Sequence, residues 1–258
     1  MPEAVIVAAA RTPIGRANKG SLVDCRPDDL SAGIIRAALE QVPALDPADV
    51  EDILWGCGQP AGESGYNVAR VVGILAGLSQ APGATVNRYC SSSLQTIRMA
   101  AHAIRAGEGD VFVAGGVETV SRFGKGMSDG LPGTHNEQFA DAEARTAALS
   151  EGTAGPWKPP PGLPDVYIAM GQTAENVVDL EHVSREEMDE FALRSQQRAV
   201  EAHKNGFFER EITPVTTPDG TLVSADDGPR PDTTLEKLSQ LKPAFRPNGS
   251  VTAGNSCP

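Results

Sequence analysis

The sequence predicts an α/β fold in which a mainly parallel sheet is covered by helices on both faces. Up to residue 116, short apolar runs of the kind found in strands buried on both faces alternate with segments whose apolar residues recur at helical spacing. Of the 258 residues, 40% are hydrophobic and 22% are charged, which allows a sizeable buried core. Alternation of strands and helices is typical of a parallel sheet.

Four apolar runs are expected to form strands of the core. They lie at residues 4–8, 52–55, 84–86 and 111–114. Three amphipathic segments between them are expected to be helices: one capped by Asp28 or Asp29, one over residues 67–76, and one over residues 91–106 that Gly107 ends. The last of these carries an apolar stripe of the kind that faces a core, formed by Leu94, Ile97, Ala101 and Ile104.

The pattern changes near residue 121. Residues 124–164 contain 13 glycines and prolines, which predicts a long irregular excursion, and such loops are usually functional, interfacial or mobile. Ser184 and Glu187 then have the spacing of a capping box. The helix that they open is expected to end at Gly206.

Two further signals complete the chain. Asp219-Gly220 lies between two strand-like stretches and predicts a hairpin with a two-residue turn. Residues 250–253 resume a strand-like pattern close to the last residue, so we expect a fragment of a longer protein whose C-terminal half is absent. The expected organisation is an N-terminal α/β core half at 1–120, an inserted loop domain at 121–247, and a truncated return strand of the core at 248–258.

Charge and cysteine content exclude several function classes. The formal net charge of −12 and a pI near 4.8 argue against a nucleic-acid binder, although a small anionic ligand remains compatible. No apolar run reaches the ~18 residues of a membrane span, and no secretory signal is recognisable. The four cysteines form no C-x-x-C pair, so no metal site is expected. We therefore predict free thiols in a reducing cytoplasm.

Cys90 is the candidate for chemistry. A short strand runs into a turn at Asn87-Arg-Tyr, and a helix is expected directly after Cys90. The first N–H groups of a helix have no internal partners and lie at the positive end of its dipole, so they favour a thiolate and could hold a developing oxyanion. The sequence also allows a different interpretation, a buried structural cysteine, because free cysteine is among the most buried residue types.

A cysteine nucleophile needs a base, and no convincing base is found. His102 lies twelve residues further along the same expected helix, which separates it from Cys90 by about 18 Å. His135 falls in the Gly- and Pro-rich excursion, while His182 and His203 flank the capped helix, and these three are interpreted as loop or surface residues.

Several motifs occur in the order found in one family. They are Val5 to Gly15, Asn87 to Gln95 around Cys90, Val113 to Ser121, Met170 to Asn176, Phe207 to Ile212, Leu241 to Phe245, and Val251 to Asn255. In these segments the sequence resembles the thiolases, which form and cleave the carbon–carbon bond of 3-ketoacyl-CoA. The resemblance extends over the whole chain and implies a thiolase-like fold with an inserted loop domain. The residues leading to Met170 look more like the fatty-acid-degrading enzymes than a compact biosynthetic acetyl-CoA acetyltransferase.

The resemblance implies roles for five positions. Cys90 matches the cysteine that is acylated, and Arg230 matches an arginine near the nucleotide end of CoA. Met170, Ala253 and Cys257 match positions along the pantetheine arm. Where relatives often have serine this chain has Cys257, and where many have histidine it has Ala169, so contacts made by those side chains are in doubt. CoA enters as a substrate, no further cofactor is implied, and the family suggests a homodimer or homotetramer.

The implied reaction is ping-pong acyl transfer through an acyl-cysteine, in fatty-acid or related lipid degradation. In the family, a histidine and a second cysteine come from Gly-His-Pro and Cys-x-Gly motifs of a C-terminal half, and an Asn-Glu-Ala-Phe motif lies there too. None of these motifs occurs in the 258 residues, so we expect this polypeptide alone to lack significant thiolysis activity.

Other interpretations are kept for comparison. Gly56 to Ala61 reads as a weak dinucleotide-binding turn. A non-catalytic CoA- or lipid-binding protein would fit the missing base, and ketoacyl synthases share the nucleophile but not the large insertion. A cluster of positive charges is compatible with phosphate contacts or with a solvated loop; it consists of Arg230, Lys237, Lys242 and Arg246.

Overall fold

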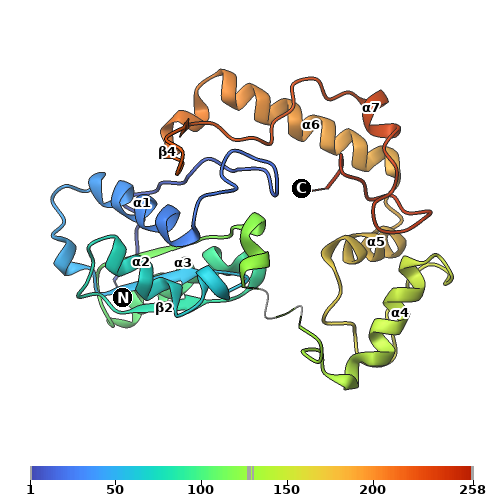
Figure 1. Cartoon of the computed structure of the whole chain (residues 1–258), viewed down its shortest axis with the longest axis horizontal. Helices are drawn as coiled ribbons and strands as arrows, with labels where there is room; N and C mark the ends of the chain where they lie inside the picture. Colours follow the sequence, from blue (N-terminus) through green and yellow to red (C-terminus); the bar gives the residue numbers. More distant parts are fainter. Residues whose placement is uncertain (1, 127–128, 130, 257–258) are drawn as a thin grey trace. The chain divides into compact units, whose positions relative to one another are not determined.

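The computed structural model describes residues 2–126, 129 and 131–256 (Figure 1). They form two compact units: unit 1 consists of the described residues of 1–128 and 208–228, and unit 2 of those of 129–207 and 229–258. Segment 208–228 therefore packs with the first part of the chain, although the sequence places it inside the expected inserted domain. The three-part division at residues 120 and 247 stays a prediction.

Unit 1 is built around a parallel three-stranded sheet of order β2-β1-β3. Its strands are β1 (Asp52–Gly56), β2 (Gly83–Val86) and β3 (Phe112–Gly116). Leu54 lies opposite Ala84 on one side and Ala114 on the other, which fixes the register. The expected parallel sheet is thus confirmed for three of the four expected strands.

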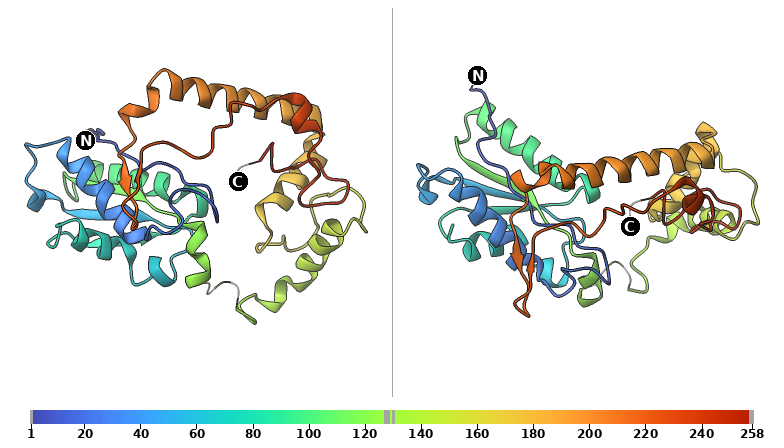
Figure 2. Two further views of the ribbon diagram at one scale, coloured as in Figure 1. Left: turned by 45° about the horizontal axis from the view of Figure 1, so that its top comes forward. Right: turned by 90° about the horizontal axis from the view of Figure 1, so that it is seen from above.

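Helices cover both faces of this sheet: α1 (Pro27–Glu40), α2 (Val68–Leu75) and α3 (Ser92–Ala106). Ile53 and Trp55 of β1 point toward α2 and form the core with Val68 and Val72, all nearly inaccessible to water. Side chains alternate along a strand, so Gly56 falls on the side that meets α3. The right-hand view of Figure 2 shows α3 on the face of the sheet opposite to α1 and α2.

The buried side of α3 is not the expected one. Leu94 is 69% exposed and Ile97 41% exposed. A Cβ atom on Gly56 would lie 2.7 Å from the backbone at the start of α3, so the helix approaches the sheet too closely for large side chains. The residues that face the sheet are therefore small: Ser92, Thr96 and Ala100.

The expected strand at residues 4–8 is also wrong. Val5, Ile6 and Val7 are 67%, 76% and 70% exposed, and residues 2–10 have no regular structure. An apolar run becomes a buried strand only when a neighbouring strand pairs with it, and none of the described residues does so here. The first pairing of this segment is at Arg11, whose N–H donates to the carbonyl of Glu211 at 2.9 Å.

Helix α1 begins differently from the expectation. Arg26 is its N-cap residue and Pro27 its first residue, and no side chain caps the helix. Asp28 instead pairs with Arg26, the nitrogen and oxygen lying 2.8 Å apart. Proline is well suited to the first helical position because the amide there has no helical acceptor, so the acidic cap is dispensable.

The predicted hairpin is confirmed, with shorter strands and a longer turn. β4 (Val215–Thr216) pairs antiparallel with β5 (Leu222–Val223). The N–H of Thr217 donates to the carbonyl of Thr221 at 2.9 Å, so a three-residue loop, residues 218–220, replaces the expected two-residue turn. Gly220 has φ 88°, the left-handed conformation that glycine adopts easily.

Unit 2 is mainly helical, with α4 (Ala140–Ser150), α5 (Met170–Glu181), α6 (Arg185–Lys204) and α7 (Leu235–Ser239). The capping box of Ser184 and Glu187 is present at the start of α6. Helix α4 lies within the excursion expected to be irregular, because an alanine-rich stretch between the glycines and prolines has high helix propensity. Short 3-10 helices are η1 (Pro47–Asp49), η2 (Gly62–Ser64), η3 (Tyr89–Ser91), η4 (Val120–Lys125), η5 (Glu137–Phe139) and η6 (Phe207–Arg210).

Residues 250–253 form no strand in the structure. The buried carboxylate of Glu175, in α5, accepts the N–H groups of Ser250 at 3.0 Å and Val251 at 2.9 Å. These are donors that a strand would give to a neighbouring strand. The segment is therefore held by a side chain of its own unit, with Val251 and Thr252 almost fully buried.

Candidate functional site

Three segments that follow the parallel strands meet at one edge of the sheet. The chain continues from β2 into the turn that carries Cys90, from β1 into Cys57 and Gly58, and from β3 into Glu118. Because the strands are parallel, their carboxyl ends lie together, which is where open α/β sheets place their sites. The topology therefore brings residues from positions 57–59, 87–90 and 118 side by side.

Cys90 is exposed in the 3-10 turn that leads directly into α3. Tyr89, just before it, has φ 45°, which is an unusual conformation for a bulky residue. The buried hydroxyl of Ser92 accepts the N–H of Arg88 at 2.8 Å and donates to the carbonyl of Tyr89 at 2.6 Å. The interpretation of Cys90 as a buried structural cysteine is therefore wrong, and its catalytic role stays a prediction.

The other two described cysteines have a different environment. Cys25 and Cys57 are 5% and 1% exposed. Burial raises the pKa of the Cys25 thiol, and burial together with the nearby Glu118 charge raises the pKa of the Cys57 thiol. Both thiols are thus buried groups with raised pKa values, whereas the sulfur of Cys90 is exposed.

This contrast predicts the order of alkylation. With iodoacetamide at neutral pH, Cys90 is expected to react about 100-fold faster than Cys25 or Cys57, because buried thiols react only when the fold opens locally. Mass spectrometry of the three peptides over time measures the rates, and the protein unfolded in denaturant serves as the control in which they converge. Modification of Cys57 as fast as Cys90 in the folded protein would contradict the assignment.

No histidine that could serve as a base for Cys90 is found among the described residues of unit 1. His102 is the one histidine among its described residues, and it is exposed on α3, about 18 Å along the helix from Cys90. The remaining histidines, His135, His182 and His203, belong to unit 2. Among the described residues of unit 1, no histidine therefore lies near the exposed sulfur of Cys90, where a cysteine nucleophile would need a base.

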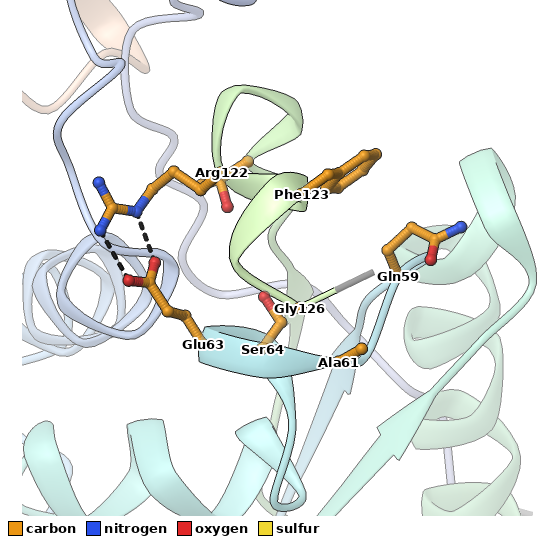
Figure 3. A pocket seen from close by; sticks show the side chains of 8 residues that line it. Gln59, Ala61, Glu63, Ser64, Arg122, Phe123 and Gly126 are labelled. Atoms are coloured by element: carbon orange, nitrogen blue, oxygen red, sulfur yellow. Dashed lines mark hydrogen bonds and ion pairs between the residues drawn. The ribbon is translucent and has the colours of Figure 1, made fainter. Parts of the chain in front are cut away.

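A pocket in unit 1 lies between the loop after β1 and η4 (Figure 3). Glu63 and Arg122 face each other along one wall and form an ion pair with two hydrogen bonds. One joins Nε of Arg122 to Oε2 of Glu63, and the other joins Nη2 to Oε1 at 2.7 Å. The hydrogen bond from Arg122 lowers the pKa of Glu63. Because Glu63 already neutralises the guanidinium, this pocket is not suited to an anionic ligand.

The dinucleotide-binding interpretation of Gly56 to Ala61 is wrong. In that motif a helix begins at the turn and its N–H groups bind a phosphate. Here α2 begins only at Val68, and the N–H of Gly58 donates to the Glu118 carboxylate at 2.7 Å. The carboxylate of Glu118 thus accepts a backbone N–H of the loop that would bind a phosphate in that motif.

Unit 2 holds the candidate residues for the CoA arm. Met170 is the first residue of α5 and is 70% exposed. Ala253 is exposed and follows the segment that Glu175 of the same helix fixes. Helix α5 therefore determines the position of both residues. Cys257 lies outside the described residues.

Arg230 borders a groove of about 280 Å³ between α6 and residues 230–233 of unit 2. The backbone N–H of Arg230 donates to the side-chain oxygen of Gln196 at 2.7 Å. The buried Nε of its guanidinium has no hydrogen-bond partner among the described residues. Lys204 and Glu201 also line this groove, so two cationic side chains and one carboxylate flank one opening.

The positive cluster suggested by the sequence divides into different roles. Arg246 is buried and donates to Gln172, Asn176 and Asp179, so it stabilises the fold and is not available to a phosphate. Lys237 forms an exposed ion pair with Asp232 at 2.8 Å. Within the cluster, Arg230 is thus the residue placed at a groove.

Two further searches concern the described residues only. No group of three or more His, Cys, Asp or Glu side chains in this part of the chain is arranged to hold a metal ion. None of its helices combines the length and apolarity needed to cross a membrane.

Comparisons with known proteins agree with this arrangement. Residues 4–258 match the family model described as "Thiolase, N-terminal domain". A beta-ketoadipyl-CoA thiolase of Acinetobacter baylyi is 44% identical over 266 residues, covering 99% of this chain and 63% of that protein. A 3-ketoacyl-CoA thiolase of Pseudoalteromonas translucida is 41% identical over 262 residues, covering 99% of this chain and 61% of that protein.

The structural comparison gives the same result. The crystal structure of the acetyl-CoA acetyltransferase of Bacillus anthracis superimposes with a TM-score of 0.74 at 35% identity, covering 98% of this chain and 61% of that one. The chain thus spans somewhat less than two thirds of the length of these relatives. With the parallel sheet, the exposed cysteine before α3 and the sequence match in one polypeptide, the chain belongs to the thiolase family.

Proposed function

We propose that the protein carrying this chain is an acyltransferase. It cleaves 3-ketoacyl-CoA with CoA into acetyl-CoA and a shortened acyl-CoA. The observation that carries the proposal is the exposed sulfur of Cys90 in the turn that opens α3. At this position the helix dipole favours an anion, first the thiolate and then the oxyanion of a tetrahedral intermediate.

The proposed reaction has two half-reactions. The Cys90 thiolate adds to the keto carbonyl, the bond between the α and β carbons breaks, and its electron pair is protonated to give acetyl-CoA. The sulfur of a second CoA then attacks the acyl-cysteine and releases Cys90. Proton transfers in both steps need groups beyond those that unit 1 places near Cys90, so residues 1–258 alone are proposed to lack steady turnover.

Unit 2 is proposed to hold the CoA arm. Arg230, with Lys204 at the same groove, offers positive charge to the phosphates of CoA. Met170, Ala253 and Cys257 are proposed to line the path of the pantetheine. CoA is treated as a substrate, with no additional cofactor.

The substrate class is narrowed by the relatives. The relatives compared above include enzymes named for beta-ketoadipyl-CoA and for 3-ketoacyl-CoA, so both dicarboxylic and monocarboxylic 3-ketoacyl chains are candidates. We place the protein in lipid or related acyl-CoA degradation in the cytoplasm, as a homodimer or homotetramer. The acetyl-CoA acetyltransferase likeness supports the reverse, biosynthetic condensation as the second candidate.

The test is formation of the acyl-enzyme. The full-length protein, incubated with acetyl-CoA, is expected to gain one acetyl group on the Cys90 peptide by mass spectrometry, and Cys90→Ala is expected to gain none. Binding of CoA without any adduct in the wild type would favour a non-catalytic CoA-binding protein instead. Steady cleavage of acetoacetyl-CoA by purified residues 1–258 would contradict the proposed inactivity of this part alone.

A further inference from the structure

A hydrogen-bonded chain of three residues connects the ends of all three parallel strands to Cys90. It begins at Glu118, two residues after β3. The carboxylate of Glu118 accepts the N–H of Gly58 at 2.7 Å and also the N–H of Gln59. Both donors belong to the loop that follows β1, so one side chain fixes two consecutive amides of the neighbouring loop.

The next link runs from Gly58 to the loop after β2. The carbonyl of Gly58 accepts the side-chain N–H of Asn87 at 3.1 Å. The side-chain oxygen of Asn87 in turn accepts the N–H of Tyr89 at 2.9 Å. Each of these groups is paired with the next one in the hydrogen-bonded chain. Removal of the group at one end therefore leaves its neighbours without a partner.

Tyr89 is the residue on which the position of Cys90 depends. Its φ of 45° costs free energy in a bulky residue and persists only where the surroundings impose it. A Cβ atom on Gly58 would lie 2.7 Å from Glu118 and 3.4 Å from the Cα of Tyr89, so Gly58 fits tightly between the two. The strained turn is therefore held from the side of β1 by contacts that start at Glu118.

We propose that Glu118 is a positioning residue for Cys90: through Gly58 and Asn87 it holds the strained turn that presents the sulfur at the start of α3. Glu118 does not touch the substrate in this role. Desolvation raises the pKa of its carboxyl and the N–H groups of Gly58 and Gln59 oppose that rise, as expected of a carboxylate directed at backbone donors. The consequence for catalysis rests on the proposed function, whereas the consequence for the reactivity of Cys90 does not.

Glu51 provides a matched control. Its carboxylate also accepts two consecutive backbone N–H groups, those of Asp110 and Val111, but at the amino ends of β1 and β3. Glu51→Ala thus removes the same type of contact from the same sheet at the edge away from Cys90. A purely structural role for Glu118 would make the two alanine variants behave alike.

The experiment measures iodoacetamide alkylation of the Cys90 peptide in the full-length protein, together with the thermal unfolding midpoint. Glu118→Ala is expected to slow alkylation about five- to tenfold, because a displaced sulfur loses the favourable end of the helix. Glu118→Gln keeps one acceptor oxygen and is expected to stay within about threefold of the wild type. Glu51→Ala is expected to alkylate at the wild-type rate. If Glu118→Ala fails to fold, Asn87→Ala removes the middle of the hydrogen-bonded chain and is expected to slow alkylation as much.

An unchanged alkylation rate in Glu118→Ala, or an equal loss in Glu51→Ala, would overturn the proposal. Where turnover is measurable, kcat of Glu118→Ala is expected to fall by the same factor as its alkylation rate, with KM unchanged. A rise of KM alone would also overturn the proposal. A wild type that forms no acyl adduct would end the proposed function, while the alkylation rates would still decide the role of Glu118.

Discussion

Full-length protein with Cys90→Ser is expected to lose about four orders of magnitude or more in kcat/KM for the cleavage of 3-ketoacyl-CoA. Serine keeps the size and the hydrogen-bonding ability of the side chain, but its hydroxyl is far less acidic and less nucleophilic than a thiol. The variant is expected to fold normally because the side chain at position 90 is exposed. Thiolysis of acetoacetyl-CoA, followed by loss of its absorbance, measures the change.

The control is the histidine on the same helix. His102 is exposed and about 18 Å along α3 from Cys90, so His102→Ala is expected to keep kcat/KM within about twofold. A loss of activity in His102→Ala as large as that in Cys90→Ser would contradict the placement of His102 away from the reacting groups. Retention of activity in Cys90→Ser would remove the acyl-cysteine mechanism altogether.

The second large effect is expected in unit 2, from Arg246→Leu. The Arg246 side chain is 9% exposed and donates to Asp179, Gln172 and Asn176. Removal of the guanidinium leaves a carboxylate and two amides without their partner in a poorly hydrated environment. Leaving partly buried acceptors without their donor in this way costs about 1–3 kcal/mol of unfolding free energy. Unit 2 is therefore expected to unfold at a markedly lower urea concentration.

The measurement can be confined to unit 2 because each unit contains one of the two tryptophans, Trp55 in unit 1 and Trp157 in unit 2. In a Trp55→Phe background, the emission of Trp157 reports on the surroundings of the network, since the backbone N–H of Trp157 donates to the Asp179 carboxylate at 2.8 Å. Lys237→Met is the control from the same charge cluster, and loss of its exposed ion pair with Asp232 is expected to leave the urea midpoint unchanged. Equal shifts in the two variants would contradict the assigned roles.

The sequence predicted local structure best where the cause is local. The capping box at Ser184 and Glu187 and the hairpin signal at Asp219-Gly220 depend on neighbouring residues, and both features are present. The predicted strands at 52–55, 84–86 and 111–114 were confirmed within two residues, because apolar runs between turns leave few alternatives.

Two predictions that depended on how elements pack against each other were wrong. The apolar stripe of α3 suggested Leu94 and Ile97 as core residues, yet glycines in the sheet brought the helix so close that Thr96 and Ala100 became buried. The apolar run at residues 4–8 read as a strand, but a strand needs a partner, which the described residues do not supply. Periodicity identifies an apolar surface but does not identify what covers it.

For the candidate site, the sequence by itself identified Cys90 as the candidate nucleophile, because a cysteine between a short strand and a helix start is a pattern of local geometry. Only the tertiary structure showed which residues support Cys90, because Glu118, Gly58 and Asn87 follow three different strands and meet through the parallel sheet. Likewise, the charges of Arg230 and Arg246 are equivalent in the sequence. Burial decided between them, because a guanidinium surrounded by acceptors of its own unit stabilises the fold, whereas one at the edge of a groove can meet a ligand.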